Sequence, residues 1–296
     1  MSTRQNNAVQ EFFSKRFRKL LSGAPDGTPP WLEIIAAGET GGLYLPSDAP
    51  WVIHRDFGTL VGGIRALLVQ ALHPATLAGV KNHSRYEKEP LGRLAGTIRW
   101  LTTTTFGSFQ AVQAEANRVN RMHTRVVGEK PVPYRASDPA LLLWVHIAFM
   151  DSFLKAHELY CKAPIPGGAD GYVKLWGKSV EPLGLAETPV DLAGLDAQMR
   201  EFLPELKYTD DTASVVRFIR KPPLPLLVRP VYALLFQAAV VSLRPEHRGL
   251  LGLKSWPSRF VIPVTRFTLV AIRTLIGPES PIEEGALARL RRVGLI

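Results

Sequence analysis

Helical periodicity is the feature of this sequence that most constrains its fold. Apolar residues recur at spacings of three and four along almost the whole chain, which is the pattern of amphipathic helices. Strand-like alternation is sparse, no repeat of fixed period is present, and no glycine-rich phosphate loop follows a strand. The sequence therefore predicts an all-α fold, built as a single large helical domain. The clearest stripe consists of Phe109, Val112, Ala116, Val119, His123 and Val126.

Local signals place the ends of several helices. Asp138-Pro139 combines a helix-capping side chain with proline at the first helical position. Ser108 can cap a helix that runs to Val127 and is closed by Gly128. Residues 1–49 are predicted to form a basic amphipathic helix and a Gly/Pro-rich approach segment, and residues 50–296 the helical domain. Its helices are expected at about 50–71, 90–105, 108–127, 141–160, 168–183, 191–203, 210–220, 226–243, 259–276 and 282–293.

Composition narrows the class of protein. The single cysteine, Cys161, excludes an internal disulfide framework, a cysteine-based zinc cluster and a four-cysteine iron–sulfur site. A reducing, cytoplasmic compartment fits this cysteine usage. The first residues lack the apolar core of a secretion signal. The apolar run Val231–Leu243 spans 13 residues, fewer than a membrane-spanning helix needs, and is interpreted as a buried helix.

The net charge of +10 is concentrated in the last third of the chain. The arginines in this last third are spread singly among leucines and prolines. They lack the interleaved aromatic residues of a surface that stacks nucleic-acid bases, so no nucleic-acid partner is expected. A solvated helical face is the simplest interpretation. Contact with a membrane surface is the alternative.

His123 is the most informative single residue by pattern. It occupies a place on its helix where leucine or valine would continue the buried stripe. A buried imidazole needs partners for its ring nitrogens, which either a hydrogen bond or metal ligation provides. Arg118, Arg121 and Arg125 share its helix. They suit the propionates of a haem, or they simply face water.

A row of mainly polar side chains borders the apolar stripe of the helix predicted at about 90–105. Arg93, Thr97, Trp100 and Thr104 follow one another at i, i+4, i+7 and i+11. These side chains can line a ligand pocket, or the threonine hydroxyls can bond to carbonyl groups of their own helix. His54, Asp56, His73, His83, His146, Asp151 and His157 supply ligand types for a non-haem metal, but no H-x-x-x-H or H-x-D motif arranges them.

Several ordered motifs together resemble the rubber-oxygenase catalytic-domain family, which includes the latex-clearing proteins and fungal MpaB-type oxygenases. The resemblance covers residues 50–160 most clearly and extends to about 250. It rests on Leu72-His73-Pro74, Ala78-Gly79-Val80, His83-Ser84, Glu89-Pro90, Arg93-Leu94, Thr97, Arg121-Met122-His123, Val126, Asp138-Pro139 and Trp144-Val145-His146.

The resemblance implies an all-α protein that encloses a haem-sized apolar pocket, binds haem b and uses dioxygen as co-substrate. His123 matches the family's axial iron ligand, held through Nε2, and the opposite axial position would be open to dioxygen. Arg93 and Thr97 match the segment on the other side of the haem and would carry catalytic roles. Arg121, Arg125 and His146 are expected to contact the cofactor, with Asp151 lining the cavity or supporting it.

Two departures from the family pattern affect the expected activity. Gly96 stands where the latex-clearing proteins carry a lysine over the iron, so their rubber cleavage does not transfer directly. The family's arginine four residues after the histidine is replaced by Val127. The prediction is therefore an oxygenase that acts on an apolar small molecule, such as an unsaturated lipid or isoprenoid. The alternatives are a non-catalytic haem- or lipid-binding protein and a membrane-docking helical protein without a cofactor.

Overall fold

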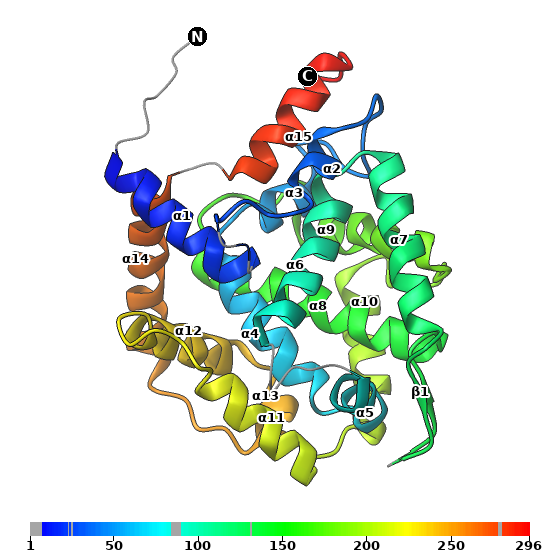
Figure 1. The fold of residues 1–296 in the computed structure, drawn as a ribbon. Coiled ribbons are helices and arrows are strands. Elements are labelled where there is room, and N and C mark those ends of the chain that lie inside the picture. The colour runs from blue at the N-terminus through cyan, green and yellow to red at the C-terminus, as the bar shows by residue number, and fades with distance from the viewer. Residues whose placement is uncertain (1–7, 23, 25, 84–89, 131, 278–279) are drawn as a thin grey trace.

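The computed structural model describes residues 8–296 apart from 23, 25, 84–89, 131 and 278–279. Several side chains near helix starts, including that of Arg93, also lie outside the description. Helices account for 69% of the chain. Within the described ranges, the only strands form one short antiparallel pair. The all-α prediction is therefore confirmed (Figure 1).

The elements follow one another along the chain as short and medium-length helices. In order they are α1 (Ala8–Ser22), α2 (Leu32–Ala36), α3 (Ala49–His54), α4 (Gly58–Gln70), α5 (Pro74–His83), α6 (Pro90–Phe106), α7 (Phe109–His123), β1 (Val127–Gly128), β2 (Tyr134–Arg135), α8 (Pro139–Tyr160), α9 (Gly168–Gly177), α10 (Leu192–Glu201), α11 (Asp210–Arg220), α12 (Arg229–Ser242), α13 (Pro245–Leu251), α14 (Ser258–Ile276) and α15 (Pro281–Arg292), with 3-10 turns at Lys178–Leu183 and Leu203–Glu205.

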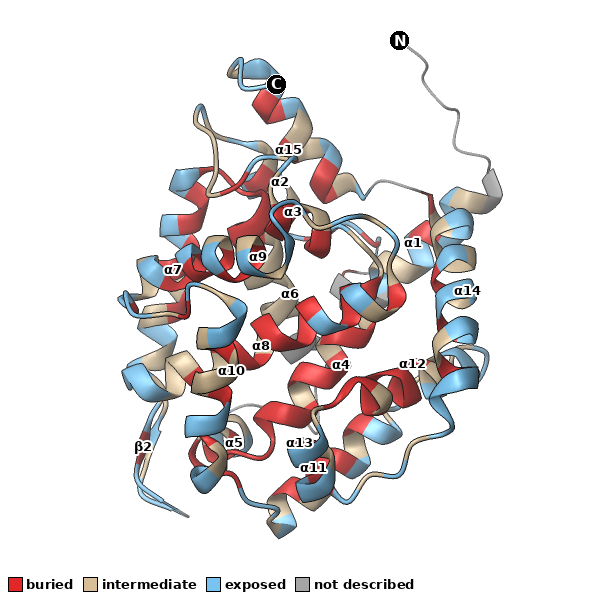
Figure 2. Cartoon of the chain, turned by 180° about the vertical axis from the view of Figure 1, so that it is seen from behind, coloured by how far each residue is buried: buried red, intermediate tan, exposed pale blue. Residues whose placement is uncertain are grey.

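The centre of the fold is the pair α4 and α8, with α12 packed on the other side of α4. Gly62 lets α4 approach α8 closely, because a Cβ at this position would lie 2.6 Å from Cδ1 of Phe153 and 3.2 Å from its Cα. Helix α8 runs through the middle of the molecule and is buried along most of its length (Figure 2). This pair carries the main hydrophobic core.

The predicted N-terminal segment packs onto the rest of the fold. Helix α1 contacts α6 and α14, and α2 contacts α15. Trp31 and Ile35 are buried with Trp51, Phe106 and Leu290 in a second apolar cluster. Residues before position 50 therefore complete the core at this end of the molecule.

The capping predictions for Asp138 and Ser108 are confirmed, but two predicted helices have other bounds. The helix predicted over 50–71 is divided into α3 and α4, and the helix after Ser108 is shorter than predicted. The side chain of Asp138 accepts a hydrogen bond from the Ala140 N–H at 2.8 Å, and that of Ser108 accepts one from Ala111 at 3.2 Å. Helix α7, however, ends at His123 instead of Val127. The reason is tertiary: Val127 pairs with Arg135 in the short hairpin.

One described helix, α8, is long and apolar enough to cross a membrane by length and composition. If each of the bent helix pairs α4–α5 and α14–α15 is counted as one span, up to three spans meet the same criteria of length and composition. Asp151 lies within α8 and is buried in ion pairs inside the fold, which is the environment of a core helix. The run Val231–Leu243 is, as predicted, largely a buried helix, α12.

Candidate functional site

His123 lies at the open end of the buried stripe of α7. Val112, Ala116 and Val119 are buried on the inner face of this helix, and His123 follows one turn later on the same face. Its side chain is half-buried, and its Nδ1 atom is shielded from solvent. The sequence pattern therefore assigned the correct face, while the depth of burial decreases toward the last residue of the helix.

The polar row of α6 is buried at the end of that helix and more open toward its start. Thr104 is completely buried, and its hydroxyl donates to the Trp100 carbonyl at 2.8 Å, so this threonine bonds within its own helix. Thr97 and Trp100 are half-buried on the same row. The side chain of Arg93, the first member of the row, lies outside the described residues. Of this row, Thr97 remains the described candidate for ligand contact.

Gly96 adjoins this row and borders open space. A Cβ built at Gly96 meets no atom of the described residues within 4 Å. Gly63 on α4 has the same property. A larger side chain would fit at either position without displacing its described neighbours.

Helices α4 and α8 each leave one apolar face half-buried. Leu60, Gly63 and Leu67 form that face on α4, while the rest of the helix is mostly buried against α8 and α12. On α8, Leu142, Val145 and Phe149 form a similar face. Among the described residues, α6 packs only marginally on either helix, and it lies in front of α8 in Figure 1 and behind it in Figure 2. These half-buried faces supply an apolar lining.

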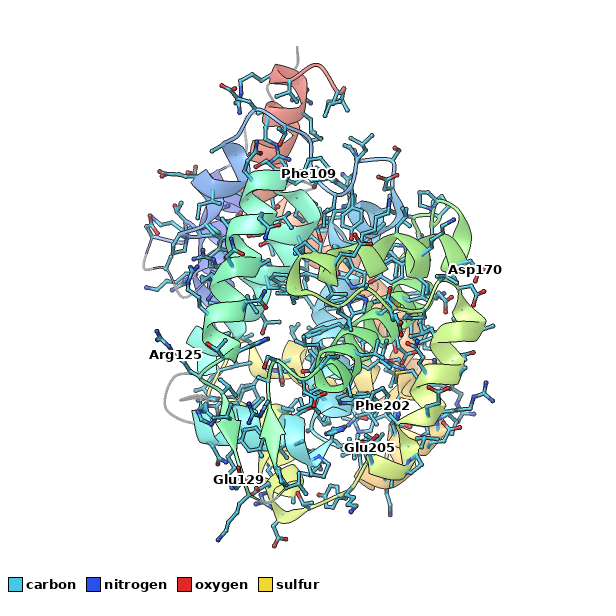
Figure 3. The ribbon with its side chains drawn as sticks, turned by 90° about the vertical axis from the view of Figure 1, so that its right-hand side faces the viewer. Phe109, Arg125, Glu129, Asp170, Phe202 and Glu205 are labelled. Carbon is cyan, nitrogen blue, oxygen red and sulfur yellow. The ribbon has the colours of Figure 1, made fainter. Side chains whose placement is uncertain are left out.

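The two arginines that flank His123 in sequence are exposed. Arg121 and Arg125 lie near the end of α7, and Figure 3 shows Arg125 extending away from the body of the molecule. Arg118, one turn earlier, pairs with the buried Glu115 at 2.6 Å. The interpretation of solvent-facing arginines therefore fits Arg121 and Arg125 in this structure, and a role in cofactor contact stays a prediction.

His146 is buried in a different aromatic environment. Its ring stacks on Trp176 with 6.2 Å between centroids, and His54 contacts the same indole edge-on at 4.3 Å. Burial lowers the pKa of His146 to about 3, so the ring is neutral. His54 is held between the Thr105 hydroxyl at 2.8 Å and the Tyr172 hydroxyl at 3.0 Å. Both histidines belong to the packed interior around α9.

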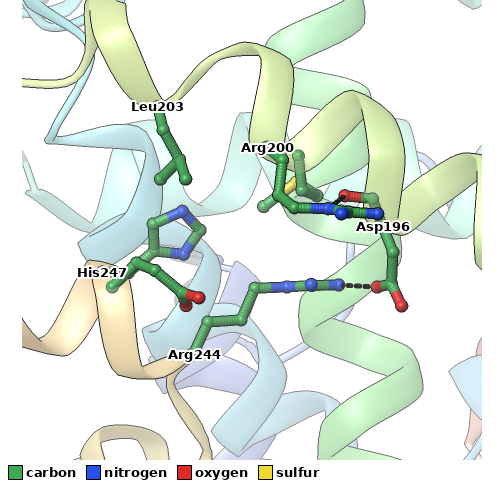
Figure 4. A pocket seen from close by; sticks show the side chains of 7 residues that line it. Asp196, Arg200, Leu203, Arg244 and His247 are labelled. Carbon is green, nitrogen blue, oxygen red and sulfur yellow. Dashed lines mark hydrogen bonds and ion pairs between the residues drawn. The ribbon is translucent and has the colours of Figure 1, made fainter.

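Asp151, expected to line or support the cavity, instead holds together a buried charge network. Its carboxylate pairs with Arg65 at 2.6 Å and with Arg244 at 2.7 Å. Arg244 continues to Asp196, and both line a small pocket of about 100 Å³ beside His247 (Figure 4). Because both sides of the carboxylate are occupied by guanidinium groups, the role of Asp151 is to neutralise the buried Arg65 and the partly buried Arg244.

A further cluster was not predicted as a unit. Asp56, His157 and Cys161 bring one ligand atom each to within 4.8 Å of one another. The spacing of His157 and Cys161, one helical turn apart, is a signal that the sequence contains. Asp56 has no such signal, because it joins the pair only through the packing of α3 and α4 against the end of α8.

These observations define a helical protein with a half-buried histidine at the end of α7, a half-buried threonine and a glycine without a described neighbour on α6, and half-buried apolar faces on α4 and α8. The chain belongs to the family described as ER-bound oxygenase mpaB/B′/rubber oxygenase, catalytic domain, whose family model matches residues 51–274. The match includes Thr97, His123 and His146, and it confirms the resemblance. No curated protein and no solved structure gives a significant match.

Proposed function

We propose that this protein is a haem b-dependent oxygenase in which Nε2 of His123 holds the iron. The observation that carries the proposal is the position of His123. It ends the buried face of α7 in a chain that belongs to an oxygenase catalytic-domain family. An imidazole is the commonest proximal ligand of haem iron in oxygen-binding proteins. The half-buried apolar faces of α4 and α8, and the space at Gly96 that no described residue fills, would suit a planar apolar group.

The protein's own residues would shape the surroundings of this group. Leu60, Leu67 and Val145 would exclude water from it, and Thr97 would donate a hydrogen bond toward a polar group of the substrate. Arg93 follows the same helical row and would orient an anionic or polar part of the ligand. Bound haem would supply the iron that activates dioxygen, while the fold supplies shape and dryness.

The first test is haem binding by a histidine variant. His123→Ala is expected to lose haem while retaining helical circular dichroism, because the ligand lies at a helix end and its removal disturbs little packing. His83→Ala is the matched control: this histidine contacts the Val127 carbonyl at 3.0 Å near the same hairpin. It should keep the haem absorption band. Full occupancy in His123→Ala would refute the assignment.

The second test uses the open space at Gly96. Gly96→Lys introduces an amine where no described atom lies within 4 Å of the new Cβ. If Gly96 faces the iron, the amine will change the visible spectrum of the haem protein. Gly63→Lys offers a comparison on α4, at a residue where a Cβ also meets no described atom within 4 Å. An unaltered spectrum in Gly96→Lys would place Gly96 away from the iron.

The proposed substrate is an apolar unsaturated molecule, a lipid or an isoprenoid, because the candidate lining is aliphatic and aromatic. Incubation of haem-loaded protein with a panel of isoprenoids and unsaturated fatty acids should give a product that requires dioxygen. Haem binding without any oxygen-dependent product would favour the alternative, a non-catalytic haem- or lipid-binding protein.

A second proposal concerns location and rests on the outer face of α14. Phe260, Val264, Phe267 and Val270 are exposed on this helix by 49–75%, and Arg266 and Arg259 accompany them. Helix α14 lies along one edge of the molecule (Figure 2). An exposed apolar face flanked by arginines is typical of helices that lie on an anionic membrane. We infer that α14 docks there, which would bring the protein to an apolar substrate.

Vesicle flotation tests this docking. The wild-type protein should float with phosphatidylserine vesicles and much less with phosphatidylcholine vesicles. Phe267→Glu should abolish flotation, because it places a charge at the membrane surface. Val190→Glu, at a position 64% exposed outside α14, is the control and should float normally. Equal flotation of both variants would contradict the assignment of α14.

A further inference from the structure

The end of α8 and the start of α4 place a thiol, an imidazole and a carboxylate together. His157 and Cys161 lie one turn apart at the carboxyl end of α8, and Asp56 lies in the connection between α3 and α4. The three ligand atoms lie within 4.8 Å of one another. Ligand atoms around a tetrahedral Zn²⁺ lie about 3.3–3.8 Å apart, given bond lengths of about 2.0–2.3 Å. A small inward movement of the side chains would close this set on a cation.

A hydrogen bond at one ring nitrogen of His157 leaves the other ring nitrogen available as a metal ligand. Nε2 lies 2.8 Å from the Ala163 carbonyl, which can only accept, so Nε2 carries the proton and donates. The remaining lone pair is therefore on Nδ1. The side chain is only 2% exposed, and Nδ1 is buried without a hydrogen-bond partner among the residues that the structure describes. A ligating histidine whose second nitrogen donates to a backbone carbonyl is the usual arrangement in metal sites.

The thiol and the carboxylate complete a donor set of the right charge. A Cβ at Gly58 would lie 2.5 Å from Cys161 Sγ, so glycine at the start of α4 makes room for the sulfur. A thiolate, a carboxylate and a neutral imidazole together balance the charge of a divalent cation. This balance lowers the cost of burying the cation. Arg273 lies 3.8 Å from Oδ2 of Asp56 and approaches the carboxylate at that oxygen.

We propose that Asp56, His157 and Cys161 form a Zn²⁺ site separate from the region around His123. The cation binds Sγ, Nδ1 of His157 and one carboxylate oxygen, and a water molecule completes the tetrahedron. Binding releases the thiol proton to solvent. The site ties the α3–α4 connection to the end of α8, two segments about a hundred residues apart in sequence. Its role is structural, because it fixes the two central helices relative to each other.

Cobalt provides a direct assay of this site. Co²⁺ replaces Zn²⁺ and gives a thiolate-to-cobalt charge-transfer band in the near ultraviolet when sulfur is a ligand. Since Cys161 is the only cysteine of the chain, this band has one possible origin. Wild-type protein should bind one equivalent of Co²⁺ with the band present, and Zn²⁺ should remove the band by competition. At 100 times the Kd, Zn²⁺ should lower the unfolding equilibrium constant about 100-fold.

Three variants identify the side chains that hold the cobalt. Cys161→Ser should lose the band. His157→Gln keeps a donor for the Ala163 carbonyl but removes Nδ1, so it should fold normally and bind Co²⁺ much more weakly. His123→Ala, the haem variant, should keep the band and one equivalent of cobalt, which makes this result independent of the proposed function.

Two results would overturn the proposal. One is a folded wild-type protein, shown by circular dichroism, that takes up no stoichiometric Co²⁺ and gives no charge-transfer band. The other is unchanged cobalt affinity in His157→Gln. The wild-type titration alone decides the first point, so the proposal stays testable even if Cys161→Ser does not fold.

Discussion

The buried ion network around Asp151 offers the strongest test of how this fold is held together. The guanidinium of Arg65 is 99% buried and has a partner on each side. It pairs with Asp151 at 2.6 Å, and it donates to the Ser152 hydroxyl at 2.8 Å and the Ser242 carbonyl at 3.0 Å. Asp151→Asn removes the negative charge but preserves the shape of the side chain. Arg65 is then a buried cation that has lost its counter-charge.

We expect Asp151→Asn to lower the free energy of unfolding by about 3–5 kcal/mol, the usual cost of breaking a buried pair from one side. Urea denaturation followed by circular dichroism at neutral pH measures this loss. Asp196→Asn is the matched control, since Asp196 pairs with the same Arg244 but is 42% exposed. Its loss should be below about 1 kcal/mol. Equal losses in the two variants would refute the reasoning.

The same carboxylate predicts a pH dependence. Burial by itself raises the pKa of Asp151, but the charges and hydrogen bonds of Arg65 and Arg244 outweigh it and lower the pKa to about 2. A pKa below the unfolded value of 3.8 contributes stability above pH 4, and this contribution is lost as pH falls from 4 to 2. The difference in unfolding free energy between wild type and Asp151→Asn should shrink by roughly 2 kcal/mol over that interval. A constant difference would contradict the assigned pKa.

Two further predictions concern helix packing and capping. Gly62→Ala should be destabilising by about 1–3 kcal/mol relative to Gly63→Ala, because only the first introduces a Cβ against Phe153. Gly63→Ala should itself raise the free energy of unfolding by up to about 1 kcal/mol, because alanine has the higher helix propensity. Thermal unfolding of the two variants without ligand measures the difference in stability. Ser108→Ala should cost about 1 kcal/mol through loss of its bond to the Ala111 N–H, measured by urea denaturation. A Gly62→Ala protein as stable as Gly63→Ala would contradict the close approach of α4 and α8.

The sequence predicted most of the helices because their signals are local. Asp138 and Ser108 cap helices through residues two or three positions away, and the stripe of α7 is visible in its own fifteen residues. The end of α7 was wrong by four residues because the hairpin partner of Val127 is Arg135, whose pairing leaves no periodic signal. The short helices α2, α5 and α13 were missed because five to ten residues show little periodicity.

The placement of the candidate residues could be predicted in part for the same reason. The face occupied by His123 and the alignment of the polar row on α6 follow from helical geometry alone. The roles expected for Asp151 and His146 depended on which distant side chains they meet. Arg244 is 93 residues from Asp151, and Trp176 packs on His146 from a different helix. Periodicity identifies the buried face of a helix, but it does not identify the partner across it.

Packing around α4 and α8 is uneven, and this unevenness bears on the proposed function. Where α4, α8 and α12 meet, the fold buries arginine and aspartate together and closes the helices on a glycine, so that region has little room to change. The opposite faces of α4 and α8 are apolar and only half-buried, and a Cβ built at Gly96 on α6 meets no atom of the described residues within 4 Å. Leaving apolar surface partly uncovered costs stability, since each buried methylene group contributes about 0.8 kcal/mol. Under the proposed function, a haem that covers these faces would offset this cost, and His123 at the open end of α7 would hold it.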